Sequence, residues 1–316
     1  MKRYSFLIIL CFALSFTMQA QNQPLAKHVV LIGLDGWAAH DFEHSHDIPN
    51  ILNLMQGGSY SMHKRCVLPA LCPNSWASLF MGVGPETHGY TQKSSVLLNS
   101  SSHGPEVSSL VTNENGIFPT IFSVIREQFP EAETGCTYEW IGIEYLIDKL
   151  SISHVKYFSA GSGHMEENCD SIARYISEKK PVFFAPCFDG IDGVGHSNGW
   201  YSPAYYNYVA RVDRCIGRII QALKDAGIYD ETIIIVTGDH GGYDHDHGRT
   251  LSNGDLEIHF EEIESPLIFF GKNVRSGYQI QEPVVQYDIA ATIAYILGLE
   301  TPSAWRGKPT TEVFIK

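Results

Sequence analysis

The sequence predicts an α/β protein whose largely parallel central sheet carries helices on both faces. Three apolar runs, at residues 28–36, 180–192 and 231–242, are typical of buried parallel strands because each is continuously apolar instead of alternating. Between the last two, residues 203–227 carry apolar side chains at helical spacing and end in glycine, which predicts a long amphipathic crossover helix. Strand, helix and strand in succession indicate a parallel sheet.

Each of these predicted strands ends in acidic residues. Asp35 closes the first run, Asp189 and Asp192 follow the second, and Asp239 follows the third. Ligands of such sheets bind beyond the carboxyl ends of the strands, which is where these carboxylates are expected. Residues 118–130 and 169–179 look like further helices.

The amino-terminal residues have the charged, apolar and small-residue order of a secretory signal. We therefore expect residues 1–20 to be a signal peptide and residues 21–316 to form a single domain of an exported protein, periplasmic or secreted. No later apolar run reaches the length of a membrane-spanning helix. Seven cysteines less Cys11 leave six, without a CxxC pair, so disulfide pairing stays open, as does the oligomeric state.

The charge balance disfavours nucleic acid as a docked partner. Without Lys2 and Arg3 the chain has 22 − 2 = 20 basic residues against 35 acidic ones, a formal charge of −15. No basic cluster forms a stripe for a polyanion, although a small nucleotide substrate remains possible.

Two clusters of carboxylates and imidazoles follow the predicted strands. Asp192 and His196 lie four residues apart in one, and Asp239 and His240 begin the other. With Asp35 they could hold two divalent ions roughly 4 Å apart, the arrangement that clamps the attacking and leaving oxygens in reactions of phosphorus or sulfur esters. A strand-end aspartate can also be a simple turn former or helix cap. For Asp244 and His245 we favour a solvated loop.

Cys72 lies at the predicted N-terminus of a helix, since Pro73 and Asn74 precede the apolar residues 76–81. Such a position attracts anions and lowers the pKa of a thiol. The residues alone leave two readings open, a poised nucleophile and a buried thiol that happens to precede a helix.

Five motifs in the same order together resemble the alkaline phosphatase superfamily, most closely its type I phosphodiesterase/nucleotide pyrophosphatase branch. They are LIGLDGW, the segment from Cys72 through MGVGPETHG, DGVGHSNG, TGDHGG followed by HG, and QYDIAATIAYILGL. The resemblance covers about residues 28–310 and implies a three-layer sandwich, related to that of sulfatases, around a two-zinc site.

Carried over residue by residue, the resemblance implies that Asp35, Asp239 and His240 hold one zinc ion and that Asp192, His196 and His247 hold the other. The family's nucleophile, a Thr or Ser, or in sulfatases a Cys oxidised to formylglycine, lies ten residues before the glycine that matches Gly82. That register places Cys72 at the nucleophile position, where its thiolate could also be a metal ligand.

Two departures from the family pattern bear on the activity. The string from Cys72 to Trp76 lacks the spaced proline and the arginine of the sulfatase motif, so conversion to formylglycine is not expected, and Ser75 is the rival nucleophile. Lys93 stands where the phosphodiesterase branch tends to place an asparagine, and a cation there favours monoesters or sulfate unless the side chain merely faces solvent. Asn74 and Lys93 are the expected substrate contacts.

The leading hypothesis is an exported, metal-dependent phosphoric ester hydrolase of the phosphodiesterase/nucleotide pyrophosphatase type, which acts on a small molecule through two zinc ions and Cys72. The alternatives are a phosphomonoesterase, a sulfatase, a catalytically silent zinc-binding relative and, more weakly, a mutase-like isomerase. We expect residues 94–162 to supply the substrate rim, with Tyr138, Trp140 and Tyr145 available for stacking unless they belong to the core. The sequence does not identify the substrate.

Overall fold

A single mixed sheet forms the centre of the molecule. The computed structural model describes residues 23–44, 47–90, 111–159, 164–249, 254–255 and 257–315, so the predicted signal peptide and Lys93 lie outside the described residues. The strands are β1 (His28–Leu34), β2 (Ser59–Arg65), β3 (Thr134–Tyr138), β4 (His154–Tyr157), β5 (Phe183–Phe188), β6 (Thr232–Gly238), β7 (Glu264–Gly271) and β8 (Tyr278–Gln279).

The strand order is β4-β3-β5-β1-β6-β7-β2-β8. The strands from β4 to β6 are parallel, whereas β7 runs antiparallel to both β6 and β2. The prediction of a largely parallel sheet is therefore confirmed. The three predicted strands are neighbours, with β1 between β5 and β6, so their carboxyl ends lie side by side.

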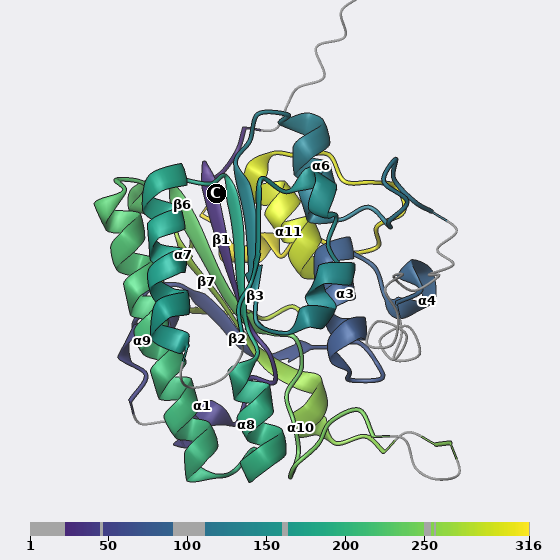
Figure 1. Cartoon of the computed structure of the whole chain (residues 1–316), viewed down its shortest axis with the longest axis vertical. Helices are drawn as coiled ribbons and strands as arrows, with labels where there is room; N and C mark the ends of the chain where they lie inside the picture. Colours follow the sequence, from purple (N-terminus) through teal and green to yellow (C-terminus); the bar gives the residue numbers. More distant parts are fainter. Residues whose placement is uncertain are drawn as a thin grey trace, which may run out of the picture.

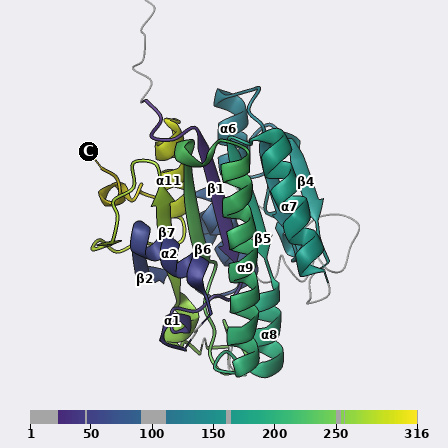
Figure 2. The same ribbon diagram turned by 90° about the vertical axis from the view of Figure 1, so that its left-hand side faces the viewer.

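Helices cover both faces of this sheet (Figures 1 and 2). Helices α2, α7 and α9 pack on one face, and α3, α6 and α11 pack on the other, which confirms the three-layer sandwich. The helices are α1 (Asp41–His44), α2 (Pro49–Gly57), α3 (Cys72–Met81), α4 (Pro85–His88), α6 (Ile121–Gln128), α7 (Met165–Lys179), α8 (Gly190–Asn198), α9 (Pro203–Asp225), α10 (Phe260–Ile263) and α11 (Asp288–Leu297), with 3-10 turns at Ile141–Tyr145, Lys149–Ser151, Tyr229–Glu231 and Thr311–Val313.

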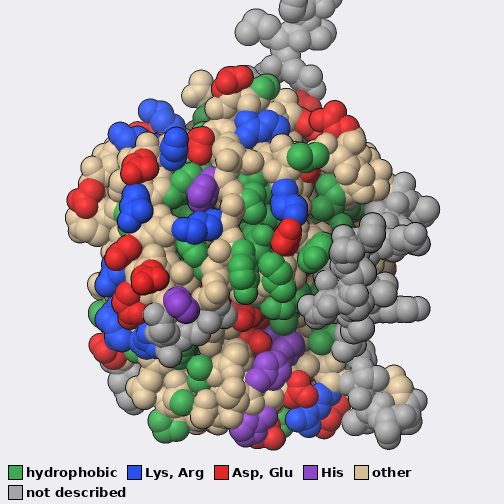
Figure 3. Space-filling model, in the orientation of Figure 1, with side chains coloured by type: hydrophobic (Ala, Val, Ile, Leu, Met, Phe, Trp, Pro, Cys, Tyr) green, Lys and Arg blue, Asp and Glu red, His purple; other side chains and the backbone are tan. Residues whose placement is uncertain are grey.

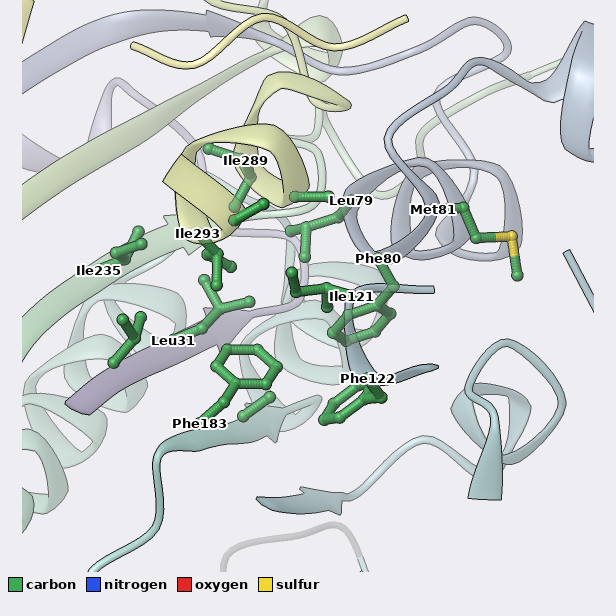
Figure 4. Close-up of a cluster of buried hydrophobic side chains, with 14 of the residues drawn as sticks. Leu31, Leu79, Phe80, Met81, Ile121, Phe122, Phe183, Ile235, Ile289 and Ile293 are labelled. Atoms are coloured by element: carbon green, nitrogen blue, oxygen red, sulfur yellow. The ribbon is translucent and has the colours of Figure 1, made fainter. Parts of the chain in front are cut away.

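Each face of the sheet buries its own hydrophobic core. Figure 4 shows the core beneath α3, α6 and α11, where side chains of three central strands meet those of the helices. A large aliphatic or aromatic side chain contributes about 1.5–3 kcal/mol when it is fully buried, so this core fixes α3 on the sheet. The labelled residues are Leu31, Leu79, Phe80, Met81, Ile121, Phe122, Phe183, Ile235, Ile289 and Ile293.

The predicted crossover helix is α9, which ends two residues before Gly227. Ser202 caps its N-terminus by accepting a hydrogen bond from the Tyr205 backbone N–H at 3.2 Å, and Pro203 opens its first turn. A disulfide between Cys169 and Cys215 joins α7 to α9, and the other four cysteines that the structure describes are free.

The described part of the predicted substrate rim consists largely of core elements. It contributes α6 to one helical layer and β3 and β4 to the sheet, because its apolar residues have the helix and strand periods of core elements. Tyr138 is buried in the core, while Trp140 and Tyr145 are half-buried. Residues 94–110 and 160–162 of this segment lie outside the described residues.

Candidate metal centre

Three adjacent strands deliver the predicted ligands to one end of the sheet. Asp35 follows β1, Asp239 follows β6, and Asp192 lies in the first turn of α8, which begins directly after β5. Figure 3 shows histidine and acidic side chains gathered at this end of the molecule, in its lower part. The carboxylates converge because their strands are hydrogen-bonded neighbours.

The first group of donors consists of Asp35, Cys72, Asp239 and His240, with one donor atom of each lying within 4.8 Å of the others. Nε2 of His240 lies 3.5 Å from Oδ1 of Asp35, 3.3 Å from Oδ2 of Asp239 and 3.4 Å from Sγ of Cys72. The mixture of carboxylate, imidazole and thiolate is a donor set that suits zinc.

The second group consists of Asp192, His196 and His247. Nε2 of His196 lies 3.4 Å from Oδ2 of Asp192, and Nε2 of His247 lies 3.5 Å from Oδ1 of the same carboxylate. The rings of His247 and His240 are stacked with centroids 3.8 Å apart, so the two groups adjoin. The Cys72 sulfur lies within 4.8 Å of a ring nitrogen of His240 and of one of His247.

Backbone carbonyls orient all three imidazoles. Nδ1 of His240 donates to Gly241 O at 2.7 Å, Nδ1 of His196 to His245 O at 2.9 Å, and Nδ1 of His247 to Ala70 O at 2.6 Å. Because a carbonyl oxygen can only accept, each Nδ1 carries a proton, and Nε2 is the ring atom of each histidine that faces the centre and can bind a cation. This is the usual outer support of a metal-binding histidine.

The carboxylates leave free oxygens at the same place. Asp239 uses Oδ1 to accept from the backbone N–H groups of Gly36 and His240, while its buried Oδ2 has no hydrogen-bond partner. Oδ1 of Asp35 and Oδ1 of Asp192 are buried without a hydrogen-bond partner as well. Unpartnered buried carboxylate oxygens are costly unless a cation binds them, so the residues fit two divalent ions.

The electrostatics of the carboxylates point the same way. Burial and the nearby Asp192 raise the pKa of Asp239 to about 8, and burial and Asp239 raise that of Asp35 well above its ordinary value. The pKa of Asp192 lies below its ordinary value. Burial acts to raise this pKa, but the hydrogen bond to His196 and the nearby His247 outweigh burial. A bound cation opposes the rises in Asp35 and Asp239 because it stabilises their charged forms.

The pKa values of the other ligands respond to the same surroundings. Burial, followed by the Asp35 carboxylate, raises the pKa of Cys72 well above that of an ordinary thiol. Burial lowers the pKa of His240 to about 3, whereas the hydrogen bond to Asp192 raises that of His196 to about 9. Binding of a cation must therefore displace protons from Cys72 and His196.

Cys72 is the first residue of α3, as expected, and its sulfur faces the first donor group. Leu71 offers no side-chain cap, and Gly82 ends the helix in the left-handed conformation at φ 63°. Ser75, the rival nucleophile, is fully buried in this helix. Asn74 is also buried and its side-chain amide donates to Pro69 O at 3.4 Å, while its Oδ1 has no hydrogen-bond partner.

Three residues around the centre were not predicted from the sequence. Trp76 donates from Nε1 to Oδ2 of Asp35 at 2.9 Å, and Glu139 accepts the backbone N–H of Asp189 at 3.0 Å. Lys64 is buried beside Gly238. Glu139 directly follows β3, so the acid after that strand could have been noticed, whereas Trp76 and Lys64 give no sequence signal of their roles. Asp244 and His245 are exposed, as a solvated loop requires.

Comparison with known protein families decides the assignment. The family described as type I phosphodiesterase/nucleotide pyrophosphatase matches residues 29–260. The chain belongs to this family. The predicted membership of the alkaline phosphatase superfamily is thereby confirmed, and the family is one of ester hydrolases.

The relatives of this phosphodiesterase family member include two mouse proteins. The chain is 26% identical to bis(5'-adenosyl)-triphosphatase enpp4 of Mus musculus, over 68% of this chain and 47% of that protein. It is 27% identical to ectonucleotide pyrophosphatase/phosphodiesterase family member 1 of Mus musculus, over 67% of this chain and 24% of that protein. The chain thus spans about half or less of the length of these relatives.

Solved structures support the fold of the family member. Human ectonucleotide pyrophosphatase/phosphodiesterase 5 superimposes with a TM-score of 0.71 at 15% identity, covering 92% of this chain and all of that one. A 2-O GAG sulfatase superimposes with a TM-score of 0.66 at 16% identity, covering 90% and 73%. No helix among the described residues is long and apolar enough to cross a membrane.

Proposed function

We propose that this protein is a metal-dependent phosphoric ester hydrolase of the phosphodiesterase type, with two zinc ions and a nucleophile at Cys72. The observation that carries the proposal is the convergence of two donor groups on one end of the sheet with Cys72 between them. Asp35, Asp239 and His240, with the Cys72 sulfur, would hold one ion, and Asp192, His196 and His247 would hold the other. When bound, the ions would neutralise charge on the ester oxygens and lower the pKa of the nucleophiles.

The chain's own residues account for the remaining steps. After the Cys72 thiol has lost its proton, Sγ attacks phosphorus, so a P–S bond forms while the P–O bond to the leaving group breaks and the departing oxygen takes up a proton from water to give the alcohol. Water then adds its oxygen to phosphorus and the sulfur leaves as a thiolate. Cys72 is held for in-line attack because α3 is fixed by the core, and the imidazoles are held by their backbone carbonyl partners.

The substrate is a small phosphate ester, and the family favours a diester. Asn74 and Lys93 are the proposed substrate contacts, since the Asn74 amide follows the nucleophile in the first turn of α3 and Lys93 would add a cation. A cation at position 93 would favour the more highly charged monoester.

Two alternatives to this function depend on the chemistry of Cys72. The first is sulfatase chemistry, which needs conversion of the thiol to an aldehyde and predicts a mass shift in the peptide that contains residue 72. The second is a silent zinc-binding protein, favoured by the 3.4 Å approach of Sγ to Nε2 of His240, because a thiolate that closes the coordination shell would exclude substrate.

We also propose export to the periplasm or beyond. The order of residues 1–20 supports a signal peptide, and the Cys169–Cys215 disulfide is of a kind that persists in oxidising compartments. Fractionation of cells that produce the full chain, with N-terminal sequencing of the product, tests this; an uncleaved cytosolic product would contradict it.

The decisive experiment compares hydrolysis of matched aryl phosphodiester, phosphomonoester and sulfate substrates by the zinc-loaded protein. Turnover of the diester that disappears in Cys72→Ala and in Asp239→Ala is the expected result. Retained turnover in Cys72→Ala would contradict nucleophilic attack by the sulfur. No turnover by the natural protein, with activity appearing in Cys72→Ser, would establish the silent alternative.

A further inference from the structure

A buried lysine lies directly behind the metal centre. Of the lysines and arginines that the structure describes, Lys64 alone is fully buried. It lies near the end of β2, where the pairing with β7 shifts register between Ser61 and Lys64. This bulge leaves the preceding His63 exposed and turns Lys64 inward. Bulges that re-aim one side chain are common beside active sites.

The ammonium group of Lys64 contacts the strand that carries a proposed metal ligand. Nζ donates to Gly238 O at 2.6 Å and also to Oε1 of Gln286. Gly238 is the last residue of β6 and immediately precedes Asp239. The charged hydrogen bond therefore fixes the peptide group from which the Asp239 side chain projects.

Gln286 continues the connection to the helix of the nucleophile. This glutamine is fully buried, and its Nε2 donates to Ser75 O at 3.3 Å, in the first turn of α3. Its backbone N–H donates to Arg65 O at 2.8 Å, so the glutamine is itself held beside β2. Lys64 and Gln286 thus form a continuous bridge, here called the Lys64–Gln286 bridge, from the end of β6 to α3.

We propose that Lys64 and Gln286 are positioning residues that hold the Cys72 helix at a fixed place relative to Asp239, so that the sulfur and the carboxylate bind the same cation. The inference rests on the metal-binding part of the proposed function. The bridge joins two proposed ligands that come from different layers of the sandwich, Asp239 after β6 of the sheet and Cys72 at the start of α3. A small shift of α3 would separate Sγ of Cys72 from the ion, whereas Asp239 and His240, which follow β6, would stay in place.

A purely structural role makes a different prediction. If Lys64 merely satisfied the Gly238 carbonyl, its loss would lower stability but leave the sulfur beside the cation. The same carbonyl also accepts a hydrogen bond from Oγ of Ser265 at 3.3 Å, and among the described residues Ser265 makes no hydrogen bond to α3. Ser265→Ala is therefore a matched control that removes a bond to Gly238 O but leaves the bridge intact.

The test uses cobalt(II) as the probe, because a thiolate ligand gives a sulfur-to-cobalt charge-transfer absorption. Metal-free protein is titrated with cobalt for the natural chain, Cys72→Ala, Lys64→Met, Gln286→Met, the Lys64→Met/Gln286→Met double variant and Ser265→Ala. Folding of each is checked by circular dichroism. We expect the natural chain and Ser265→Ala to show a band that Cys72→Ala lacks.

Each bridge variant should still bind cobalt but lose most of the band, with an affinity lower by about 10- to 100-fold. The double variant should resemble the single ones, because each removes the same bridge. A full band in folded Lys64→Met or Gln286→Met, or no band in the natural chain, would overturn the inference. If Lys64→Met does not fold, Gln286→Met decides. If the natural chain shows the band but no ester turnover, and the bridge variants lose the band, the proposed function is contradicted and this inference is supported.

Discussion

Trp76 and Asp35 are joined by a hydrogen bond that ties α3 to the candidate metal centre. The indole Nε1 donates to Oδ2 of Asp35 at 2.9 Å, and both side chains are buried. The bond leaves Oδ1 of Asp35 free beside His240. A Cβ on Gly33 would lie 2.4 Å from the indole ring, so glycine at that position in β1 allows the tryptophan to reach the carboxylate.

Trp76→Phe should weaken metal binding more than it weakens the fold. Phenylalanine keeps a buried ring but cannot donate to Asp35, so the carboxylate is free to rotate away from the ion. The expected loss is about 10- to 100-fold in metal affinity, the usual effect of removing an outer hydrogen bond of a metal ligand. Competition with a chromophoric chelator measures it.

Trp305→Phe is the matched control for that substitution. Nε1 of Trp305 donates to Pro119 O at 2.9 Å, and its ring packs over Gly82 at the far end of α3 from Cys72. It should lose stability without a change in metal affinity. Equal affinities for Trp76→Phe and the natural chain would show that the bond does not orient Asp35.

His247→Ala and His245→Ala should differ in metal stoichiometry. His247 is buried with Nε2 facing Asp192, whereas the exposed His245 contributes its backbone carbonyl, which alanine retains. His247→Ala should bind one ion fewer per chain, and His245→Ala should match the natural protein. Elemental analysis after gel filtration gives the ratio. The same loss in both variants would mean that the loop as a whole, not the His247 ligand, holds the ion.

His88 should make the metal-free protein less stable in acid. Its Nδ1 accepts the Tyr90 backbone N–H at 3.0 Å and its Nε2 lies 3.0 Å from Oγ of Ser78, while burial lowers its pKa to about 3. Above about pH 6.5 neither the folded nor the unfolded chain protonates it. Between pH 6.5 and 3 only the unfolded chain binds the proton, so stability falls as the pH falls.

Because of His88, the free energy of unfolding should fall by about 2 kcal/mol between pH 7 and pH 5. His88→Gln should show a correspondingly shallower loss over that range, although its stability at pH 7 is itself lower. Urea denaturation of both proteins, with chelator present, measures the two slopes. Parallel slopes would show that His88 is protonated equally easily in the folded and unfolded chains.

Loss of the Cys169–Cys215 disulfide should affect stability but not chemistry. The bond closes a sequence separation of 46 residues between α7 and α9. A loop of this length predicts a loss of about 2–4 kcal/mol in the double Ala variant. Thermal denaturation with and without reductant measures this loss. Reductant should lower the melting temperature of the natural chain to that of the variant and leave the melting temperature of the variant unchanged. An unaltered melting temperature would contradict the stabilising role.

The order of the sequence motifs was enough to predict the fold and which donor side chains lie close together. Apolar runs at residues 28–36, 180–192 and 231–242 became β1, β5 and β6, because continuous apolar runs that end in acid have few other uses in an α/β chain. The two predicted groups of metal ligands recur in space as donor groups. Which parts of residues 94–162 form a substrate rim was less predictable. The core elements α6 and β3 share the apolar composition of the segment around them, so composition does not separate core from rim.

By itself, the sequence determined which side chains can bind cations and that a helix begins at Cys72, because both depend on residue type and on the local period of apolar residues. Only the tertiary structure decided that β1 lies between β5 and β6, which brings three acids from distant parts of the chain to one place. It also decided that Trp76 holds Asp35 and that a bulge turns Lys64 toward Gly238. Such contacts depend on how layers pack and on a one-residue shift in strand register, and neither leaves a periodic trace in the sequence.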